Sequence, residues 1–331
     1  MNTLVTGASG FVGSHLVKRL GQAGHQVYAL VRSSSNLAAL QPLAAKLVYG
    51  DVRDKASLER IVQQYPAIDT VFHLASVLTP VSVDDSLYWD INYQGTQNLL
   101  EVCRQASLKA FIQCSSVGVI GPLPTIPADE TARCAPDSNY GKSKYQAEQL
   151  ALQYHQQFGL PVAVVRPAWI YGPGDRRTYK FFRMVARGRF FLIGSGQTQL
   201  SPVYVDDVVQ GLILCADQIE QAAGEVFIVA GPTTVSLETL ASTIAQEAGT
   251  SILPVKVPAG IARLGATLCE TLCKPLGIEP PIHRRRLDFF CRDQAFDTTK
   301  IRQTLGFQPR IDLPTGVKST ITWYQQQGWL P

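Results

Sequence analysis

Short apolar runs alternate with longer amphipathic stretches along the first half of the chain. The runs are rich in Val, Leu, Ile and Phe, and they lie at residues 2–6, 26–31, 46–49, 70–73, 110–114 and 161–165. Runs of this length are typical of strands that are buried on both faces of a parallel sheet. The stretches between them have helical apolar spacing, as at residues 15–20. The pattern predicts an α/β fold with a doubly wound parallel sheet.

A glycine-rich turn follows the first apolar run. Gly7, Gly10 and Gly13 are each separated by two residues, and a helical stretch comes next. In such a turn the glycines allow a tight bend, a close approach to a pyrophosphate and close packing of helix on strand. The phosphates would sit at the helix N-terminus, where unpaired N–H groups favour anions. We predict a dinucleotide site here, and an ordinary glycine-rich strand–helix turn is the alternative interpretation.

Arg32 ends the second apolar run and precedes three serines and Asn36, with no carboxylate among them. NAD sites usually have an acidic residue about 20 positions after the glycines, whereas an Arg accommodates the 2′-phosphate of NADP. A guanidinium and several hydroxyls suit a phosphate dianion. We expect NADP(H) to be preferred and NAD(H) to be possible. The alternative is a solvated arginine at a strand end.

Tyr140 and Lys144 are four residues apart and would share one face of a helix. A positive charge beside a phenol lowers its pKa from about 10. Such a phenol can exchange a proton with an alcohol or carbonyl oxygen near neutral pH. Ser116 follows the run that ends at Cys114, where its hydroxyl can hydrogen-bond a substrate oxygen. Each residue also has a structural interpretation, as a cap, a packing aromatic or a solvated lysine.

The order of these motifs resembles the extended short-chain dehydrogenase/reductases, the NAD-dependent epimerase/dehydratase group. The glycines fit that family's TGxxGxxG turn, and Tyr140-x-x-x-Lys144 fits its catalytic pair. Further matches follow in order along the chain, at residues 50–52, 72–75, 92, 114–116, 166–167, 171–174, 205–208 and 305–309.

The resemblance implies a Rossmann fold, with Ser116, Tyr140 and Lys144 as the catalytic residues. It also implies a cofactor-binding role for the glycine turn, for the loop near the adenine and for the ends of the later strands. The residues expected to bind the cofactor are Gly7, Ser9, Gly10, Phe11, Val12, Gly13, Arg32, Asp51, Val52, Leu74, Ala75, Ser76, Asn92, Ser115, Tyr140, Lys144 and Pro167.

The alternation of runs ends near residue 170. Beyond it we predict a helix and turn at 179–191, a helix at Asp206–Ala216 and a strand at Glu225–Val229. We expect a dinucleotide-binding domain at 1–170 and 203–230. A smaller, discontinuous and mainly C-terminal lobe at 171–202 and 231–331 would bind the substrate. The resemblance also suggests a homodimer that pairs helices near 92–105 and 140–154.

The composition of the chain mainly excludes classes of partner and of site. The chain has 331 residues, of which 46% are hydrophobic and 17% charged, and a net charge of +4 gives no reason to expect nucleic acid. No apolar run reaches the ~18 residues that span a bilayer, and the first strand leaves no room for a targeting segment. The seven cysteines include no C-x-x-C pair, so we expect a reduced, cytoplasmic protein. Cys269 and Cys273 share a helix face without a third ligand, so no metal is expected.

Two positions differ from the nucleotide-sugar members of the resembled family. Trp169 stands where they have an Asn that meets the sugar nucleotide, and Leu200 stands where they carry an Arg that binds a phosphate. An apolar residue cannot neutralise a diphosphate in a partly closed site. The chain is more similar here to the 3β-hydroxysteroid dehydrogenase and dihydroflavonol reductase branch, as it is at Ala29–Arg32.

An apolar helix is predicted between Pro258 and Pro275, with Ile261, Leu264, Leu268 and Leu272 on one face. We expect this face to pack on its own domain. The alternatives are that it lines an apolar substrate pocket or touches a membrane surface. The basic run at 283–286 would be a solvated face, or would contact an anionic substrate tail or a lipid head group.

Three functions follow from these observations. The first is an NADP(H)-preferring oxidoreductase that moves hydride between nicotinamide and a secondary alcohol or ketone of a steroid-, isoprenoid- or flavonoid-like molecule. The second is a nucleotide-sugar epimerase or dehydratase with tightly bound NAD, against which Trp169, Leu200 and Arg32 count. The third is a non-catalytic cofactor sensor or assembly factor, against which the complete set of Ser116, Tyr140 and Lys144 counts.

Overall fold

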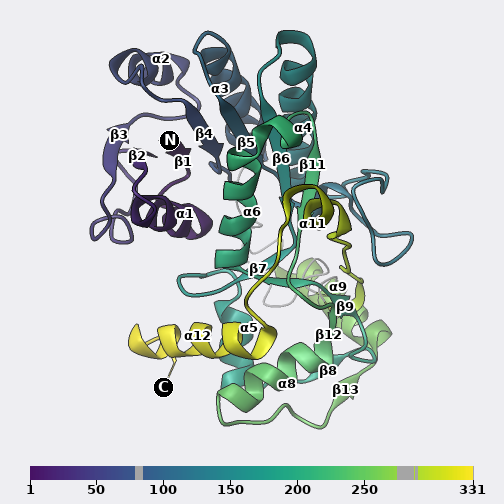
Figure 1. Ribbon diagram of the computed structural model, residues 1–331. Helices are drawn as coiled ribbons and strands as arrows, with labels where there is room; N and C mark the ends of the chain where they lie inside the picture. The colour runs from purple at the N-terminus through teal and green to yellow at the C-terminus, as the bar shows by residue number, and fades with distance from the viewer. Residues whose placement is uncertain (79–84, 274–286, 288–289, 331) are drawn as a thin grey trace.

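The computed structural model describes residues 1–78, 85–273, 287 and 290–330, and its main feature is a seven-stranded parallel sheet (Figure 1). The strand order is β11-β6-β5-β4-β1-β2-β3. The strands are β1 (Asn2–Thr6), β2 (Gln26–Val31), β3 (Lys46–Tyr49), β4 (Thr70–His73), β5 (Ala110–Cys114), β6 (Val162–Pro167) and β11 (Val226–Val229). The prediction of a doubly wound parallel sheet is confirmed. The direction of strand order reverses between β1 and β4, and ligands bind at such a switch point.

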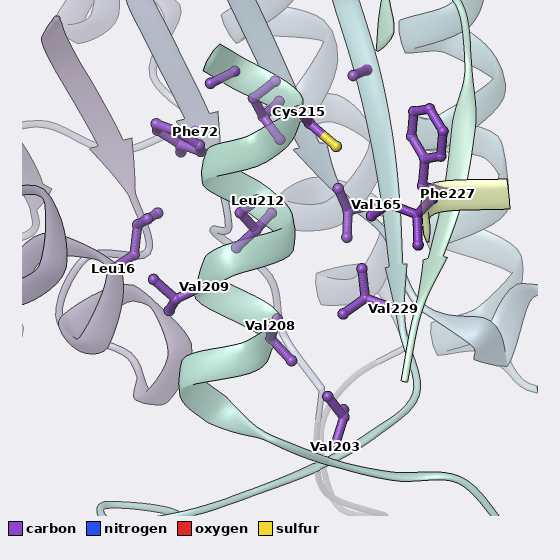
Figure 2. Close-up of a cluster of buried hydrophobic side chains, with 14 of the residues drawn as sticks. Leu16, Phe72, Val165, Val203, Val208, Val209, Leu212, Cys215, Phe227 and Val229 are labelled. Atoms are coloured by element: carbon purple, nitrogen blue, oxygen red, sulfur yellow. The ribbon is translucent and has the colours of Figure 1, made fainter. Parts of the chain in front are cut away.

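Helices cover both faces of this sheet. On one face α1 (Phe11–Gln22), α6 (Val205–Asp217), α7 (Ile219–Ala222) and α11 (Thr299–Leu305) supply buried apolar side chains. Figure 2 shows α6 on this face, with Val209 directed toward Leu16 of α1 and with Val208 and Leu212 in the same buried cluster. On the other face α2 (Lys55–Gln64), α3 (Gly95–Arg104) and α4 (Asn139–Phe158) pack on the strands.

Besides the apolar clusters on the two faces of the sheet, a separate hydrophobic core, here called the second core, lies beyond the carboxyl ends of the strands. It is rich in aromatic residues, including Tyr171, Phe182, Phe190 and Tyr324, all almost fully buried. Its elements are β7 (Trp169–Tyr171), α5 (Tyr179–Ala186), β8 (Leu192–Ile193), β9 (Gln199–Leu200), β10 (Pro202–Tyr204), β12 (Val235–Ser236), α8 (Leu237–Glu247) and α12 (Leu313–Gln326). In Figure 1 α5, α8 and α12 form the lower part of the molecule.

Three parts of the chain differ from expectation. The helix expected from residue 92 begins earlier, as a π-helix, η1 (Tyr88–Gln94), that continues into α3. Leu200 is fully buried in the second core, so packing explains its apolar character. The stretch around α11 was expected in the smaller lobe, but Phe296, Ile301 and Phe307 pack with the cluster beside the sheet.

Helix α9 (Ala259–Cys273) forms where an apolar helix was expected, after β13 (Lys256–Val257). The prediction that its apolar face packs on its own domain is wrong for Ile261, Leu264 and Leu268, which are all exposed. The side chain of Leu272, Pro275 and the basic run at 283–286 lie outside what the structure describes. Among the described helices, none combines the length and the apolar character needed to cross a bilayer.

Candidate functional site

The glycine turn between β1 and α1 is packed too closely for side chains. Gly7 has φ +67°, and a Cβ on it would lie 2.7 Å from the backbone N of Ala75 at the end of β4. A Cβ on Gly13 would lie 2.1 Å from the carbonyl oxygen of Gly7. The turn therefore needs glycine at both positions, because any side chain would displace backbone.

Helix α1 presents an uncapped N-terminus at this turn. Gly10 is the N-cap and offers no side-chain acceptor, and the first turn of the helix contains no acidic residue. The first N–H groups of a helix have no partner within it, and they carry partial positive charge. A dinucleotide pyrophosphate fits this end of the helix, as the sequence predicts.

A buried hydroxyl lies at the carboxyl edge of the same sheet, just after β5. Ser115 lies just after β5 and is 4% exposed, and its Oγ has no hydrogen-bond partner among the described protein groups. An unpartnered buried polar group destabilises a fold unless something binds it. Ser115 and the glycine turn thus both fit a bound dinucleotide.

Two arginines flank Asp51 at the carboxyl ends of β2 and β3. Arg53 binds the Asp51 carboxylate through Nε and Nη2, the latter at 2.7 Å from Oδ2. These hydrogen bonds hold the pKa of Asp51 below its usual value, and the nearby Arg32 acts in the same direction. Arg32 itself is exposed. Two guanidinium groups thus lie close to Asp51 at this end of the sheet, and Asp90 lies within electrostatic range of Arg53.

Ser116 and Tyr140 meet at the end of β5. Ser116 caps the 3-10 helix η2 (Val117–Val119), where its Oγ accepts from the N–H of Gly118 at 3.1 Å. Tyr140 lies in the first turn of α4, whose N-cap Ser138 accepts from Gly141 N–H. A Cβ on Gly118 would lie 3.3 Å from Ser116 Oγ and 3.8 Å from Tyr140 Cε1. The two predicted catalytic side chains thus border the same small space.

Lys144 lies one turn further along α4 and is only 2% exposed. Its Nζ donates to the carbonyl oxygen of Cys114 at 2.5 Å, which fixes the ammonium at the end of β5. Burial lowers the pKa of Lys144, while Cys114 and Glu148 act in the opposite direction. A further acceptor beside Nζ, such as a ribose hydroxyl, would offset the desolvation of this charge.

A buried ion pair holds α4 against the sheet. Glu148 on α4 is fully buried and pairs with Arg166 of β6, with Nε 3.0 Å from Oε2 and Nη2 2.5 Å from Oε1. Removing one partner of such a pair leaves an uncompensated buried charge, which costs about 3–5 kcal/mol. Arg166, part of the Arg-Pro motif, therefore anchors the helix that carries Tyr140 and Lys144.

A chain of buried hydrogen bonds starts at the glycine turn. Ala75 N–H donates to Thr6 Oγ1, which lies 2.7 Å from Nδ1 of His73, and Nε2 of His73 lies 2.9 Å from Thr96 Oγ1. Thr96 donates its proton to the carbonyl oxygen of Asn92, so Nε2–H must donate to Thr96 and Nδ1 must accept from Thr6. The ring is neutral in this arrangement, and burial lowers the pKa of His73 to about 3.

Asn92 extends this chain of hydrogen bonds to α4. Its Oδ1 accepts from Ser76 Oγ and from Val77 N–H, and its Nδ2 donates to the Val77 carbonyl oxygen and to Ser143 Oγ at 3.0 Å. Ser143 in turn donates to the carbonyl oxygen of Tyr140 at 2.9 Å. All hydrogen-bonding positions of the Asn92 amide are thus used within the protein. Asn92 can act on the cofactor site by holding the loop after β4.

The remaining predicted residues lie around the same edge of the sheet. Leu74 follows β4 beside Gly7, and Pro167 is buried at the end of β6. Phe11 and Val12 turn toward the second core, so the turn contacts both halves of the molecule. Val52 is buried against Gly95 of α3 and lies, with Arg32 and Asp51, on the β2–β3 side.

Sequence reasoning did not identify Thr96, Ser143 and Gly118 as parts of the site. Thr96 contacts His73, which is 23 positions away, and Ser143 contacts Asn92, which is 51 positions away. Gly118 lies beside Tyr140, which is 22 positions away. No local spacing signals such contacts. A local signal exists only for Ser138, which stands three residues before Gly141 as a helix N-cap should.

Comparison with known proteins agrees with this geometry. The profile of the "NAD dependent epimerase/dehydratase family" matches residues 3–230, more than half of the chain. An N-acetyl-alpha-D-glucosaminyl-diphospho-ditrans,octacis-undecaprenol 4-epimerase of Escherichia coli O157:H7 is 29% identical, over 97% of this chain and 95% of its own. A decarboxylating sterol-4-alpha-carboxylate 3-dehydrogenase of Schizosaccharomyces pombe is 27% identical, over 98% of this chain and 97% of its own.

Among solved structures, the UDP-glucose 4-epimerase of Thermotoga maritima with UDP-glucose has a TM-score of 0.80 and 27% identity, with 99% of both chains covered. The similarity thus extends over the second core as well as the sheet. Nearly full-length relatives include both sterol dehydrogenases and sugar epimerases, so the prediction of an enzyme of this type is confirmed. The chain belongs to the NAD dependent epimerase/dehydratase family, the extended short-chain dehydrogenase/reductases that its motifs resemble.

Proposed function

We propose that the chain is an oxidoreductase that prefers NADP(H) and acts on a secondary alcohol or ketone of an apolar molecule. The observation that carries this proposal is the convergence of Ser116 and Tyr140 at the end of β5, with the buried Lys144 one turn away. Carbonyl reduction needs a group that gives a proton to the substrate oxygen and a second hydroxyl that hydrogen-bonds the same oxygen.

Each residue has a distinct role in the proposed reaction. The Tyr140 hydroxyl gives its proton to the substrate oxygen during reduction and takes it back during oxidation. Ser116 Oγ already accepts from Gly118 N–H, so its role toward the substrate oxygen is to donate. The Lys144 ammonium stabilises negative charge on the Tyr140 oxygen and binds ribose hydroxyls. A bound nicotinamide supplies or accepts the hydride at the carbon that carries the substrate oxygen.

The preference for NADP(H) rests on the charges around Asp51. NAD sites use a carboxylate on the ribose 2′-hydroxyl at the end of the second strand, where this chain has Arg32, and the nearby Asp51 carboxylate is bound on both oxygens by Arg53. Arg32 is exposed at the end of β2, beside Ser35, whose Oγ accepts from the Arg32 N–H. A guanidinium and hydroxyls in this place suit a 2′-phosphate, although the family also contains NAD-dependent enzymes.

An apolar substrate is supported by the second core. Trp169 stacks on Tyr171 with ring centroids 5.8 Å apart, and its edge-to-face neighbour is Phe181 at 6.3 Å. This aromatic surface directly follows Pro167 at the end of β6, where a sugar-binding Asn was expected in nucleotide-sugar enzymes. The sterol substrate named for the fission yeast relative agrees with an apolar ligand. Leu200 no longer supports this choice, because it is a core residue.

An epimerase with tightly bound NAD is the second candidate, because relatives of this kind match the chain from end to end. The two functions differ in the fate of the cofactor. An oxidoreductase consumes one cofactor for each product, whereas an epimerase leaves the cofactor unchanged overall.

A screen with the purified protein separates the two candidates. We expect steroid-, isoprenoid- or flavonoid-like ketones to drive stoichiometric NADPH oxidation and to raise the Tm by mass action. Conversion of UDP- or GDP-sugars without net cofactor consumption would replace the proposal by the epimerase.

Two further features complete the proposal. All seven cysteines are free thiols, which suits a cytoplasmic enzyme.

A homodimer that pairs α3 and α4 of two subunits would leave the carboxyl edge of the sheet, where the site lies, open to ligands. Light scattering at several protein concentrations tests whether this dimer forms.

A further inference from the structure

Helix α9 turns its large apolar side chains away from the protein. Ile261, Leu264 and Leu268 are 62%, 68% and 64% exposed, and their spacing puts them on one face of the helix. The residues that α9 packs inward are small, such as Ala262, Ala266 and Cys269. A helix that packs on its own domain has the reverse arrangement, with the large apolar residues inside.

Further exposed apolar side chains stand just before α9 in the chain. Leu253 and Val255 are also exposed, in the segment that leads into β13 and α9. Five of the ten large apolar side chains that are exposed in the described residues therefore fall between positions 253 and 268. The other five are scattered over separate elements. Concentration of apolar surface in one place marks a binding surface more clearly than single exposed residues do.

Exposed basic residues lie on α9 itself and near Leu253. Leu253 N–H donates to the carbonyl oxygen of Phe190, which brings the chain around Arg187 and Arg189 beside it. Both arginines are exposed, as is Arg263 on α9 itself. The sequence contains no Asp or Glu within residues 183–195 or 248–269, and the acidic Glu238 that reaches this region from α8 is paired with Lys256 at 3.2 Å. The partner should therefore be apolar and carry negative charge.

We propose that the exposed face of α9, together with Leu253 and Val255, docks on the surface of a bilayer that contains anionic lipid. A bilayer offers acyl chains to Ile261, Leu264 and Leu268, and anionic head groups to the arginines. A second copy of the chain fits less well, because a twofold contact would place two basic surfaces against each other. Docking would bring the site to a substrate dissolved in the bilayer, and this consequence alone rests on the proposed function.

Vesicle sedimentation with the full-length chain tests this proposal without any need for turnover. We expect the protein to bind vesicles of phosphatidylcholine and phosphatidylglycerol, more weakly at high salt, and to bind pure phosphatidylcholine poorly. The double variant Leu264→Gln/Leu268→Gln keeps good helix formers and should bind at least about tenfold more weakly. The control Tyr49→Gln/Ile126→Gln changes exposed apolar residues elsewhere and should bind as the wild type does.

Other results would overturn the proposal. Absence of vesicle binding by the wild type, or equal binding by both double variants, would do so. A marked fall in Tm of Leu264→Gln/Leu268→Gln with unchanged vesicle binding would mean that the chain itself covers this face. A wild-type dimer that the same variant converts to monomer would identify a second copy as the partner. An unchanged Kd for NADPH in every variant shows that the cofactor site is intact, so failed docking is distinct from a failed enzyme assignment.

Discussion

Replacement of Asn92 by Ala should slow the reaction without any direct contact between Asn92 and the reacting atoms. The side chain is fully buried and makes four hydrogen bonds, one of them to Ser143, which bonds the Tyr140 carbonyl. At about 0.5–1.5 kcal/mol each, their loss lowers the free energy of unfolding by about 2–6 kcal/mol. The loop after β4 and the first turn of α4 lose their connection, so Tyr140 can shift.

The effect on rate can be estimated from this shift. A displacement of about 1 Å in a reacting group can lower a rate by about 100-fold. We therefore expect kcat at saturating cofactor to fall about 10–100-fold in Asn92→Ala, measured with the best substrate of the screen and with the Tm recorded in parallel.

Asn98→Ala is the matched control, because Asn98 is also buried and its side-chain bonds in the described part of the chain go to Val52 and Gln94, away from Tyr140. This variant should lose about 1–3 kcal/mol of stability and keep its kcat. Equal kcat values for Asn92→Ala and Asn98→Ala would refute the role of Asn92 in positioning Tyr140.

Three further predictions concern charged groups. Burial holds the pKa of Lys144 below its unfolded value of 10.5, so the folded state is penalised below that pH. Lys144→Met should therefore raise the Tm near pH 7, and the gain in Tm should disappear as the pH approaches 10.5. The same variant should lower kcat at least about 100-fold. A fall in the Tm at pH 7 would contradict the claim that the buried charge destabilises the fold. Arg32→Ala should raise the Kd of NADP(H) about 10–100-fold and leave the Kd of NAD(H) unchanged, and the control Arg60→Ala should change neither. An equal loss of affinity for both cofactors would argue against a 2′-phosphate site at Arg32. The hydrogen bond between His15 Nδ1 and Asp206 Oδ1 holds the pKa of Asp206 below 3.8, so Asp206→Asn should lower the Tm slightly at pH 7, and this difference should vanish as the pH falls through that lowered pKa.

The strands of the sheet could be predicted from the sequence within a residue or two. Buried parallel strands such as β1 and β5 appear as unbroken apolar runs, and the glycine turn has a steric cause that needs no tertiary context. The helix α4 could be located as well, and with it the shared face of Tyr140 and Lys144. These features depend on neighbours that are close in sequence.

Contacts between distant residues could not be predicted in this way. The bonds of His73 to Thr6 and Thr96 join three elements, and nothing in local spacing indicates them. Leu200 was interpreted by comparison with a binding residue, although burial in the second core decides its character. For α9 the periodicity identified the apolar face correctly, but periodicity does not specify which surface covers a face.

The most direct test of the catalytic assignment is the turnover of Tyr140→Phe. This variant keeps the ring that packs beside Gly118 and removes only the hydroxyl. We predict that kcat falls at least about 100-fold, in line with the loss of a general acid or base, while the Kd of the cofactor and the Tm stay unchanged. A Tyr140→Phe enzyme with wild-type turnover of the same substrate would contradict the assignment of Tyr140 as the proton donor and acceptor.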